Sequence, residues 1–145
     1  MFTGEYRHSL DSKNRVSIPS KFREEAGDVL FVTRGLDNCL FVFSSKEWDV
    51  FSSRLAELPI SNKDARKFAR TFLSGAFECN IDKQGRILLP QNLKEYAGID
   101  KEVYVNGAGA RMEIWDSAKW EDYSLNLTND LDEIAEGMEG LGIRF

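Results

Sequence analysis

The sequence has few of the residues that usually carry catalysis or bind metals. One histidine, His8, and two cysteines, Cys39 and Cys79, occur in 145 residues. Neither cysteine has the C-x-x-C partner or nearby histidine of a zinc site, and a lone histidine more often serves packing than phosphate contact. There is no phosphate-binding P-loop and no Ser-His-Asp set. The sequence therefore gives no reason to expect an enzyme, a bound metal or a cofactor.

Long apolar runs are also missing. No stretch approaches the roughly 18 apolar residues of a membrane-spanning helix, and residues 1–13 lack the apolar core of an export signal. Three prolines and 42% hydrophobic residues indicate a folded core rather than disorder. The two cysteines are not equivalent in the repeat described below, which favours buried free thiols over a disulfide. These features predict a cytoplasmic protein.

Basic residues are in the minority. The net charge is −5 at pH 7 with a pI near 5.0, which at first argues against nucleic acid as a partner. The charge is uneven, however. Residues 113–145 contain two basic and nine acidic side chains, so the remainder of the chain has a net charge of +2. A local DNA-binding surface on that remainder is compatible with the composition.

What the sequence does contain is an internal repeat. Residues 4–51 recur as residues 75–123, at an offset of 71 that becomes 72 after one inserted residue. Two copies of one small unit predict a pseudo-two-fold pair, and such symmetry suits a two-fold partner such as duplex DNA. The matched residues are Gly4, Asp11, Arg15, Pro19, Glu24, Ala26, Gly27, Ser45 and Trp48 with Gly75, Asp82, Arg86, Pro90, Glu95, Ala97, Gly98, Ser117 and Trp120.

Each copy predicts the same order of elements. A strand, a tight turn and a returning strand form a predicted hairpin, with Asn14 or Gly85 providing the positive φ that such turns need. A proline follows, then a short helix that begins at Ser20 or Gln91 and ends at a glycine cap. Two more strands complete each copy, and four short strands are too few to bury both faces unless the copies pair. The predicted strands are 4–10, 15–18, 29–32 and 40–43, and 77–81, 86–89, 102–105 and 112–115.

Helical segments lie between and after the copies. A helix over 46–58 is ended by Pro59, and a second helix up to residue 74 is capped by Ser61 or Asn62. We divide the chain into repeat 1 (4–51), a helical insert (52–74), repeat 2 (75–123) and an acidic helical tail (124–145), with an amphipathic helix over 117–138. The basic face of the insert helix contains Lys63, Arg66, Lys67 and Arg70. Arg66 and Arg70 could extend the phosphate contacts, although such a stripe is more often a solvated helix face.

The sharpest motif is D-x-x-x-R-x-x-x-P, which occurs once in each copy. Aspartate and arginine four apart across a turn can form an ion pair that fixes the guanidinium, and arginine suits guanine edges and phosphates. The alternative is that each pair only staples its turn. Duplication and nearby basic residues favour an anion-facing site. The motif residues are Asp11 with Arg15 and Asp82 with Arg86, and the nearby basic residues are Arg7, Lys13, Lys21, Arg23 and Lys83.

On these motifs the chain resembles the MraZ family of bacterial regulators. The resemblance extends from Phe2 to about Met138 and is carried by GEYRHSLDSKNRVSIPSKFR, FECNIDKQGRILLPQNLKEYAGI, TRGLDNCLFVF and MEIWDSAKWEDY. It implies an α+β fold in which two tandem SpoVT-AbrB-like units form a pseudo-two-fold swapped-hairpin β-barrel flanked by amphipathic helices. It also implies a cytoplasmic, nucleoid-associated regulator, usually a repressor. Such a regulator assembles into a ring-shaped homo-oligomer and binds short direct repeats in the promoter of its own division and cell-wall gene cluster.

The resemblance places DNA-binding roles on residues of both copies. Arg15 and Arg86 are the main candidates, and Asp11 and Asp82 position them. Lys13 and Lys83 are weaker candidates because they are not equivalent positions in the two copies, and Arg7 and Lys21 are candidates as basic residues near the motifs. The helices at 61–74 and 117–138, one basic and one acidic, are candidates for contacts between protomers. Two other functions stay open: an oligomeric scaffold that recruits a protein through its acidic C-terminal region, and an antitoxin-like protein, which the helical C-terminus disfavours.

Overall fold

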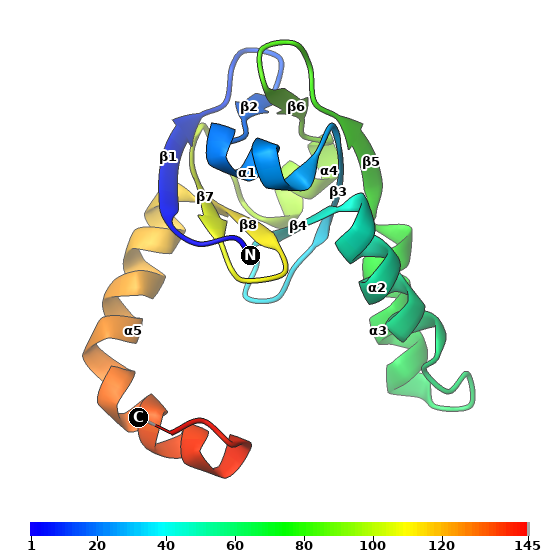
Figure 1. The fold of residues 1–145 in the computed structure, drawn as a ribbon, viewed down its shortest axis with the longest axis vertical. Coiled ribbons are helices and arrows are strands. Elements are labelled where there is room, and N and C mark those ends of the chain that lie inside the picture. Colours follow the sequence, from blue (N-terminus) through cyan, green and yellow to red (C-terminus); the bar gives the residue numbers. More distant parts are fainter. Residues whose placement is uncertain (145) are drawn as a thin grey trace.

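The computed structural model describes residues 1–144 and combines antiparallel strands with helices at the periphery (Figure 1). Six strands form one sheet in the order β1-β7-β8-β4-β3-β5, and β2 pairs with β6 in a separate ribbon. The strands are β1 (Glu5–Ser9), β2 (Arg15–Ser17), β3 (Val29–Arg34), β4 (Leu40–Ser44), β5 (Phe77–Asn80), β6 (Arg86–Leu88), β7 (Glu102–Gly107) and β8 (Met112–Asp116). The helices are α1 (Ser20–Ala26), α2 (Ser45–Ala56), α3 (Lys63–Ser74), α4 (Gln91–Tyr96), α5 (Ser117–Met138) and the 3-10 turn η1 (Glu139–Leu141).

The two repeats exchange their first strands. Strand β1 of repeat 1 pairs with β7 of repeat 2, β5 of repeat 2 pairs with β3 of repeat 1, and β2 pairs with β6. The prediction that β1 and β2 would pair as a hairpin, like β5 and β6, was therefore wrong. Each tip keeps only a local turn, in which the backbone N–H of Asp11 or Asp82 donates to the carbonyl of Arg15 or Arg86 at 3.0 or 2.9 Å.

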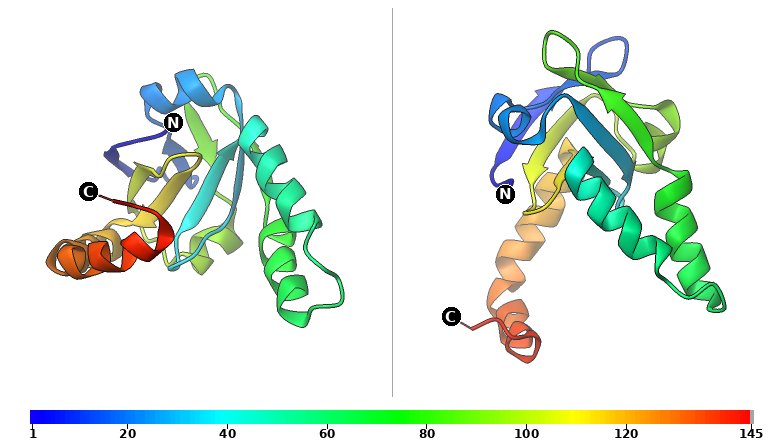
Figure 2. Two further views of the ribbon diagram at one scale, coloured as in Figure 1. Left: turned by 60° about the horizontal axis from the view of Figure 1, so that its bottom comes forward. Right: turned by 45° about the vertical axis from the view of Figure 1, so that its right-hand side comes forward.

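Strand exchange has a physical reason in the small size of each unit. One repeat has too few strands to cover its own apolar face, and the sister repeat supplies the missing partners. The α+β class and the pairing of two units are confirmed. The hydrogen-bonded ladder among residues 1–144 is a strongly curved open sheet beside a short ribbon (Figure 2), so closure into a complete barrel is not confirmed.

The core takes equivalent residues from both repeats. Val16 and Ile87 from the ribbon and Phe22 and Leu93 from the short helices are almost fully buried together. Both cysteines are buried free thiols, as predicted. Burial raises the pKa of the Cys79 thiol to about 11.

The two short helices begin where predicted, directly after a proline. Helix α1 ends at the predicted glycine: Gly27 has φ 82°, and its N–H donates to the carbonyl of Arg23. Helix α4 differs, because its last turn is capped by Ala97 and the glycine, Gly98 with φ 61°, comes one residue later. The glycine with positive φ is therefore the cap itself in repeat 1, whereas it follows the cap in repeat 2.

Helices α2 and α3 form an antiparallel pair that projects from the sheet (Figures 1 and 2). Asn62, one of the two predicted caps, accepts a hydrogen bond from the N–H of Ala65 at 2.9 Å. Helix α2 ends at Ala56, three residues before Pro59. Phe72 of α3 joins a second apolar cluster, where its ring stacks against Phe41 with centroids 6.1 Å apart.

Helix α5, like the α2–α3 pair, projects from the sheet (Figure 1), and it has the predicted bounds 117–138. Its first turns carry Trp120 and Tyr123, which pack on Trp115 of β8. Among residues 1–144, none of the helices combines the length and apolar character needed to cross a bilayer.

Candidate nucleic-acid interface

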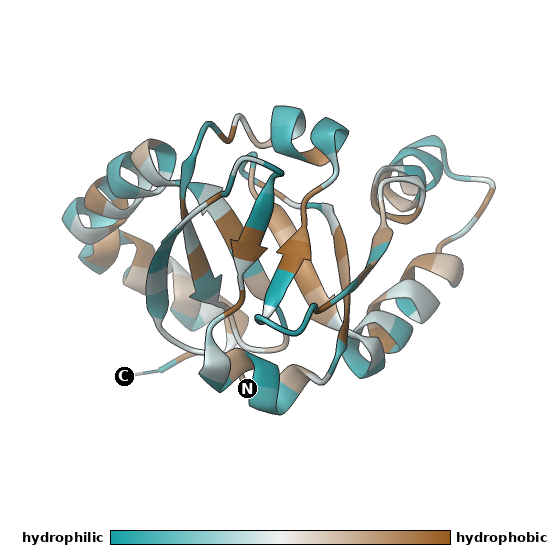
Figure 3. Ribbon diagram, turned by 90° about the horizontal axis from the view of Figure 1, so that it is seen from above, coloured by the Kyte–Doolittle hydropathy of each residue, from teal (hydrophilic) through white to brown (hydrophobic). Residues whose placement is uncertain are grey.

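The two D-x-x-x-R motifs lie at one end of the molecule, in the turns that lead into β2 and β6. We call these turns the motif loops: loop 1 comprises residues 11–15 and loop 2 comprises residues 82–86. Viewed from above, β2 and β6 lie side by side at the centre of this end (Figure 3). Helices α2, α3 and α5 extend from the opposite side of the sheet (Figure 1). The pseudo-symmetry thus brings two copies of one motif, far apart in the chain, to a single surface.

Each motif loop is folded around its aspartate. One carboxylate oxygen of Asp11 accepts hydrogen bonds from the backbone N–H groups of Lys13 and Arg15, at 2.9 and 2.8 Å. Asp82 does the same for Gln84 and Arg86, at 2.8 and 2.9 Å. Short polar side chains that bond to the backbone two residues on are typical of such turns. The aspartates therefore set the backbone shape of the tips.

The second oxygen of each carboxylate orients an arginine. Arg15 Nε donates to Asp11 Oδ2 at 2.7 Å, and Arg86 Nε donates to Asp82 Oδ2 at 3.1 Å. Both ion pairs confirm the contact predicted from the spacing. Arg86 also donates through Nη1 to Asp11 Oδ2 at 3.3 Å. Asp11 thus holds both arginines and joins the two loops.

The arginines keep part of their surface accessible. The side chains of Arg15 and Arg86 are 33% and 23% exposed. Fixed guanidinium groups of this kind can bind a carboxylate, a phosphate or the edge of a guanine with little loss of side-chain entropy. The surface is therefore suited to an anionic partner.

Hydrogen bonds keep both aspartates ionised. The pKa of Asp11 is lowered mainly by the backbone N–H of Arg15, and the Arg15 guanidinium adds to this effect. The pKa of Asp82 is lowered mainly by the backbone N–H of Arg86. Since both carboxylates carry charge near neutral pH, the ion pairs persist there.

The turn of loop 1 is braced by the short helix of repeat 2. Asn14 has φ 59° and accepts a hydrogen bond from Lys94 Nζ at 3.1 Å. It also donates through Nδ2 to Gln91 Oε1 at 3.3 Å. Its backbone carbonyl accepts from the N–H of Leu89. The asparagine thus ties the loop to α4 and β6.

The turn of loop 2 is braced by the equivalent helix of repeat 1. Gly85 has φ 77°, and a Cβ placed there would lie 2.6 Å from Cζ of Arg23. Arg23 itself donates through Nε to the carbonyl of Ile18. Arg23 and Lys94 are equivalent at the offset of 71. Sequence reasoning missed Lys94, although the repeat of a basic residue at this position was a usable signal.

The remaining predicted residues fall into two groups. Lys13, Lys83 and Lys21 are exposed, the first two in the motif loops and the third on α1 beyond loop 1. Arg7 is not brought to the loops. It lies in β1, with Nη1 3.3 Å from Glu121 Oε1 and Nε 3.9 Å from Glu102 Oε2. Its charge is therefore largely matched by carboxylates of β7 and α5.

Other basic residues and the histidine lie elsewhere. Arg66 and Arg70 belong to α3, and the α2–α3 pair extends away from the motif loops (Figure 1). Within residues 1–144, His8 Nε2 is buried without a hydrogen-bond partner, and burial lowers the pKa of this imidazole. This environment fits packing better than phosphate contact.

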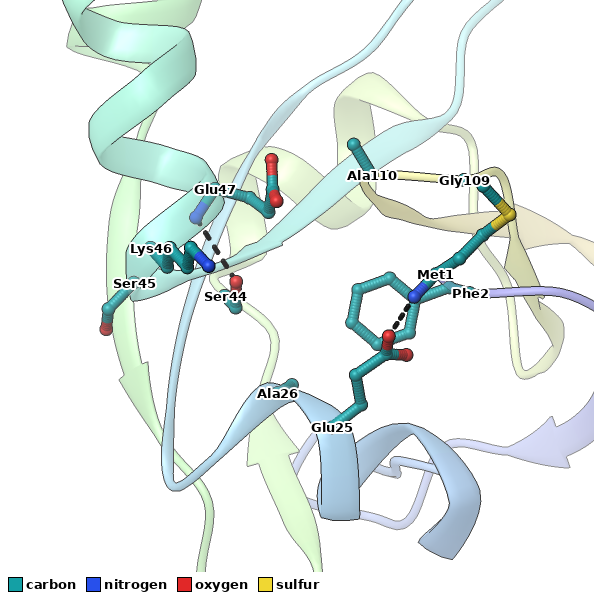
Figure 4. Close-up of a pocket in the computed structure, with 10 residues that line it drawn as sticks. All are labelled: Met1, Phe2, Glu25, Ala26, Ser44, Ser45, Lys46, Glu47, Gly109 and Ala110. Atoms are coloured by element: carbon teal, nitrogen blue, oxygen red, sulfur yellow. Dashed lines mark hydrogen bonds and ion pairs between the residues drawn. The ribbon is translucent and has the colours of Figure 1, made fainter.

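A cavity of about 640 Å³ lies away from the motif loops, between the N-terminus, α1 and the start of α2 (Figure 4). Its charged groups include Glu25, which pairs with the amino group of Met1. Ser44 Oγ accepts a hydrogen bond from the N–H of Glu47 and caps α2. No cluster of three or more potential metal ligands occurs in the part of the chain that the structure describes.

Comparison with known proteins identifies relatives along the whole chain. A family model described as "MraZ protein, putative antitoxin-like" matches residues 1–71 and again residues 72–140. A protein of Acetivibrio thermocellus is 54% identical over 143 residues, which cover 99% of this chain and 100% of the relative. Proteins of Alkaliphilus oremlandii and Clostridium tetani are each 53% identical with the same coverage. All three relatives bear the name "Transcriptional regulator MraZ".

Proposed function

The chain belongs to the MraZ family, and on that premise we propose that it is a DNA-binding transcriptional regulator whose two motif loops contact the major groove. The names of its relatives support regulation of transcription. The observation that carries the DNA-binding part is the pair of loops at one end, in which aspartates fix Arg15 and Arg86. No enzymatic role is proposed.

The loops suit duplex DNA for reasons of size and chemistry. A two-stranded β-ribbon fits the major groove, and arginine can donate two hydrogen bonds to O6 and N7 of guanine. We assign base contacts to Arg15 and Arg86, with Asp11 and Asp82 as positioning residues. The exposed lysines Lys13, Lys83 and Lys21 would contact phosphates. Arg7, already paired with Glu121, would contribute least.

The finer function follows from the family. We propose that the protein is a repressor that binds short direct repeats in the promoter of its own division and cell-wall gene cluster, in the cytoplasm and associated with the nucleoid. We further propose a ring-shaped homo-oligomer. Adjacent protomers on repeated sites would gain affinity through effective concentration, by factors of roughly 10² to 10⁴. This gain would offset the net charge of −5, which opposes binding to a polyanion.

The first test is fluorescence anisotropy with DNA from upstream of the gene and with a shuffled control, across a salt series. We expect tighter binding to the native sequence and a steep fall in affinity as salt rises, because phosphate contacts release counterions.

Absent binding to both DNAs, or equal binding that does not change with salt, would refute the proposal. It would favour the alternative of an oligomeric scaffold that recruits a protein through the acidic C-terminal region. A salt-sensitive but sequence-independent signal would contradict base reading by the arginines while leaving phosphate binding in place.

A further inference from the structure

An exposed leucine lies on the surface that we assign to DNA. Leu88 is the last residue of β6, and its side chain is 58% exposed. Ile87, the preceding residue of the strand, is buried in the core. Because successive side chains of a strand point to opposite faces, Leu88 and Arg86 share the outer face of the β2–β6 ribbon. Viewed from above, this ribbon lies at the centre of the end that carries the motif loops (Figure 3).

The register of the ribbon places Leu88 beside loop 1. Leu88 lies directly opposite Arg15, and facing residues of an antiparallel pair have Cβ atoms about 4.5–5.5 Å apart. The N–H of Leu89 donates to the carbonyl of Asn14 at 2.9 Å, which ties this end of β6 to loop 1. The leucine of repeat 2 is therefore a neighbour of the arginine of repeat 1.

The pseudo-symmetric position has a different side chain. At the offset of 71, Leu88 corresponds to Ser17, which lies directly opposite Arg86. The N–H of Ile18 donates to the carbonyl of Gly85 at 2.9 Å and so repeats the backbone bond found at loop 1. The two halves of the surface therefore share one backbone framework. Only the half with loop 1 has an apolar side chain facing its arginine.

A leucine at this position suits one feature of the major groove. The base edges there present hydrogen-bonding groups, and the C5-methyl group of thymine is their apolar contact point. The side chain of Leu88 can neither donate nor accept a hydrogen bond. Packing it on any other base edge would remove water from a polar group without replacing the hydrogen bond, which is unfavourable.

We infer that Leu88 packs on the methyl group of a thymine next to the guanine bound by Arg15. The inference rests on the DNA binding proposed above and names a base that the protein selects. In the other half of the site Ser17 faces Arg86 and lacks this apolar contact. The selected DNA site therefore differs between its two halves, although the backbone of the protein is nearly symmetric there.

The test removes the methyl group from the DNA. Deoxyuridine pairs as thymidine does but lacks the methyl group, so promoter duplexes are made in which each thymidine in turn is replaced by deoxyuridine. Anisotropy titrations at one salt concentration compare the wild type with Leu88→Ser, which has the side chain of the equivalent position. We expect one replacement next to a guanine to weaken wild-type binding about four-fold, the effect of one buried methyl group. The same replacement should leave the binding of Leu88→Ser unchanged.

Two matched variants locate the contact. Ser17→Leu places a leucine opposite Arg86, and its binding should become sensitive to the methyl group of a thymine next to the second guanine. Leu36→Ser removes a leucine that is 54% exposed in the turn between β3 and β4, on the side of the sheet away from the motif loops (Figure 1). This variant should bind every duplex as the wild type does. Circular dichroism of all three variants should match the wild type.

The inference would be overturned if no deoxyuridine replacement weakens wild-type binding, because no methyl contact would then exist. It would also be overturned if the effective replacement weakens Leu88→Ser equally, since another residue would then make the contact. No new methyl sensitivity in Ser17→Leu would contradict the matched geometry of the two halves.

Failure of this inference is distinguishable from failure of the proposed function. A wild-type protein that does not bind the promoter would refute the proposed function and this inference together. Selective binding to the native promoter without a methyl effect that depends on Leu88 would refute the inference alone.

Discussion

Replacing Asp11 by asparagine is expected to weaken promoter binding more than replacing Asp82, although the two residues are equivalent in the repeat. The Asp11 carboxylate accepts from the guanidinium groups of both Arg15 (Nε) and Arg86 (Nη1), whereas among the arginine side chains of residues 1–144 Asp82 accepts only from Arg86 Nε. Asparagine keeps one carbonyl oxygen for the backbone N–H groups of the loop. At the other position it can place an NH₂ donor against a guanidinium donor.

The two substitutions leave the arginines in different states. In Asp82→Asn, Arg86 still has Asp11 as a partner and Arg15 is untouched. In Asp11→Asn, Arg15 loses its only carboxylate partner among residues 1–144. Loss of one aligned arginine–guanine contact corresponds to about a 5- to 150-fold loss of discrimination. We expect a loss in this range for Asp11→Asn and only a few-fold loss for Asp82→Asn.

The assay is anisotropy on native and shuffled promoter DNA at one fixed salt concentration, with Arg15→Ala as reference. The ratio of the affinity for native DNA to the affinity for shuffled DNA should fall in Asp11→Asn to nearly the value found for Arg15→Ala. Equal ratios for the two asparagine variants, or a larger loss for Asp82→Asn, would show that Asp11 does not have the bridging role inferred from its contacts.

Three further predictions concern stability. The lowered pKa values of the two motif aspartates mean that their stabilisation is present above the ordinary value of 3.8 and is lost as the pH falls through the lower folded values. Urea unfolding measured from pH 6 to pH 2 should therefore show that the free energy of unfolding falls less in a variant with asparagine at both positions than in the wild type. Phe72→Ala should lower the free energy of unfolding by about 3–5 kcal/mol because this ring is 2% exposed, whereas Phe68→Ala, at 44% exposed, should cost clearly less by the same measurement. Gly85→Ala should lower the free energy of unfolding by about 1–2 kcal/mol because of the positive φ of this residue. Asn14→Gly, at the position with the same turn conformation, should change the free energy of unfolding less. Equal losses in the two variants would contradict this reasoning.

Local features were predictable because their causes lie close together in the chain. Pro19 before a helix, Asn62 as a cap and the Asp–Arg spacing depend on interactions within a few residues, and the structure confirms them. The repeat also indicated that two units would pair. These are the effects that periodicity, capping and turn chemistry describe.

Features that depend on distant partners were not predictable from one sequence. Alternating strands do not reveal whether β1 pairs with β2 or with β7, because either choice buries the same side chains. The bond between Arg86 and Asp11 spans 75 positions, and that between Lys94 and Asn14 spans 80. Arg7 looked free in the sequence but meets Glu121, 114 positions away. Only the fold brings these charges together.

The exchange of strands between repeats also bears on how the protein is made. The ribosome releases repeat 1 first, when β1, β2 and β3 still lack β7, β6 and β5. At about 5–20 residues per second, the second half emerges several seconds later. During that interval the nascent chain exposes unpaired strand edges that could join a neighbouring nascent chain. Neither half should fold alone, and the native state should form in one cooperative step after synthesis is complete.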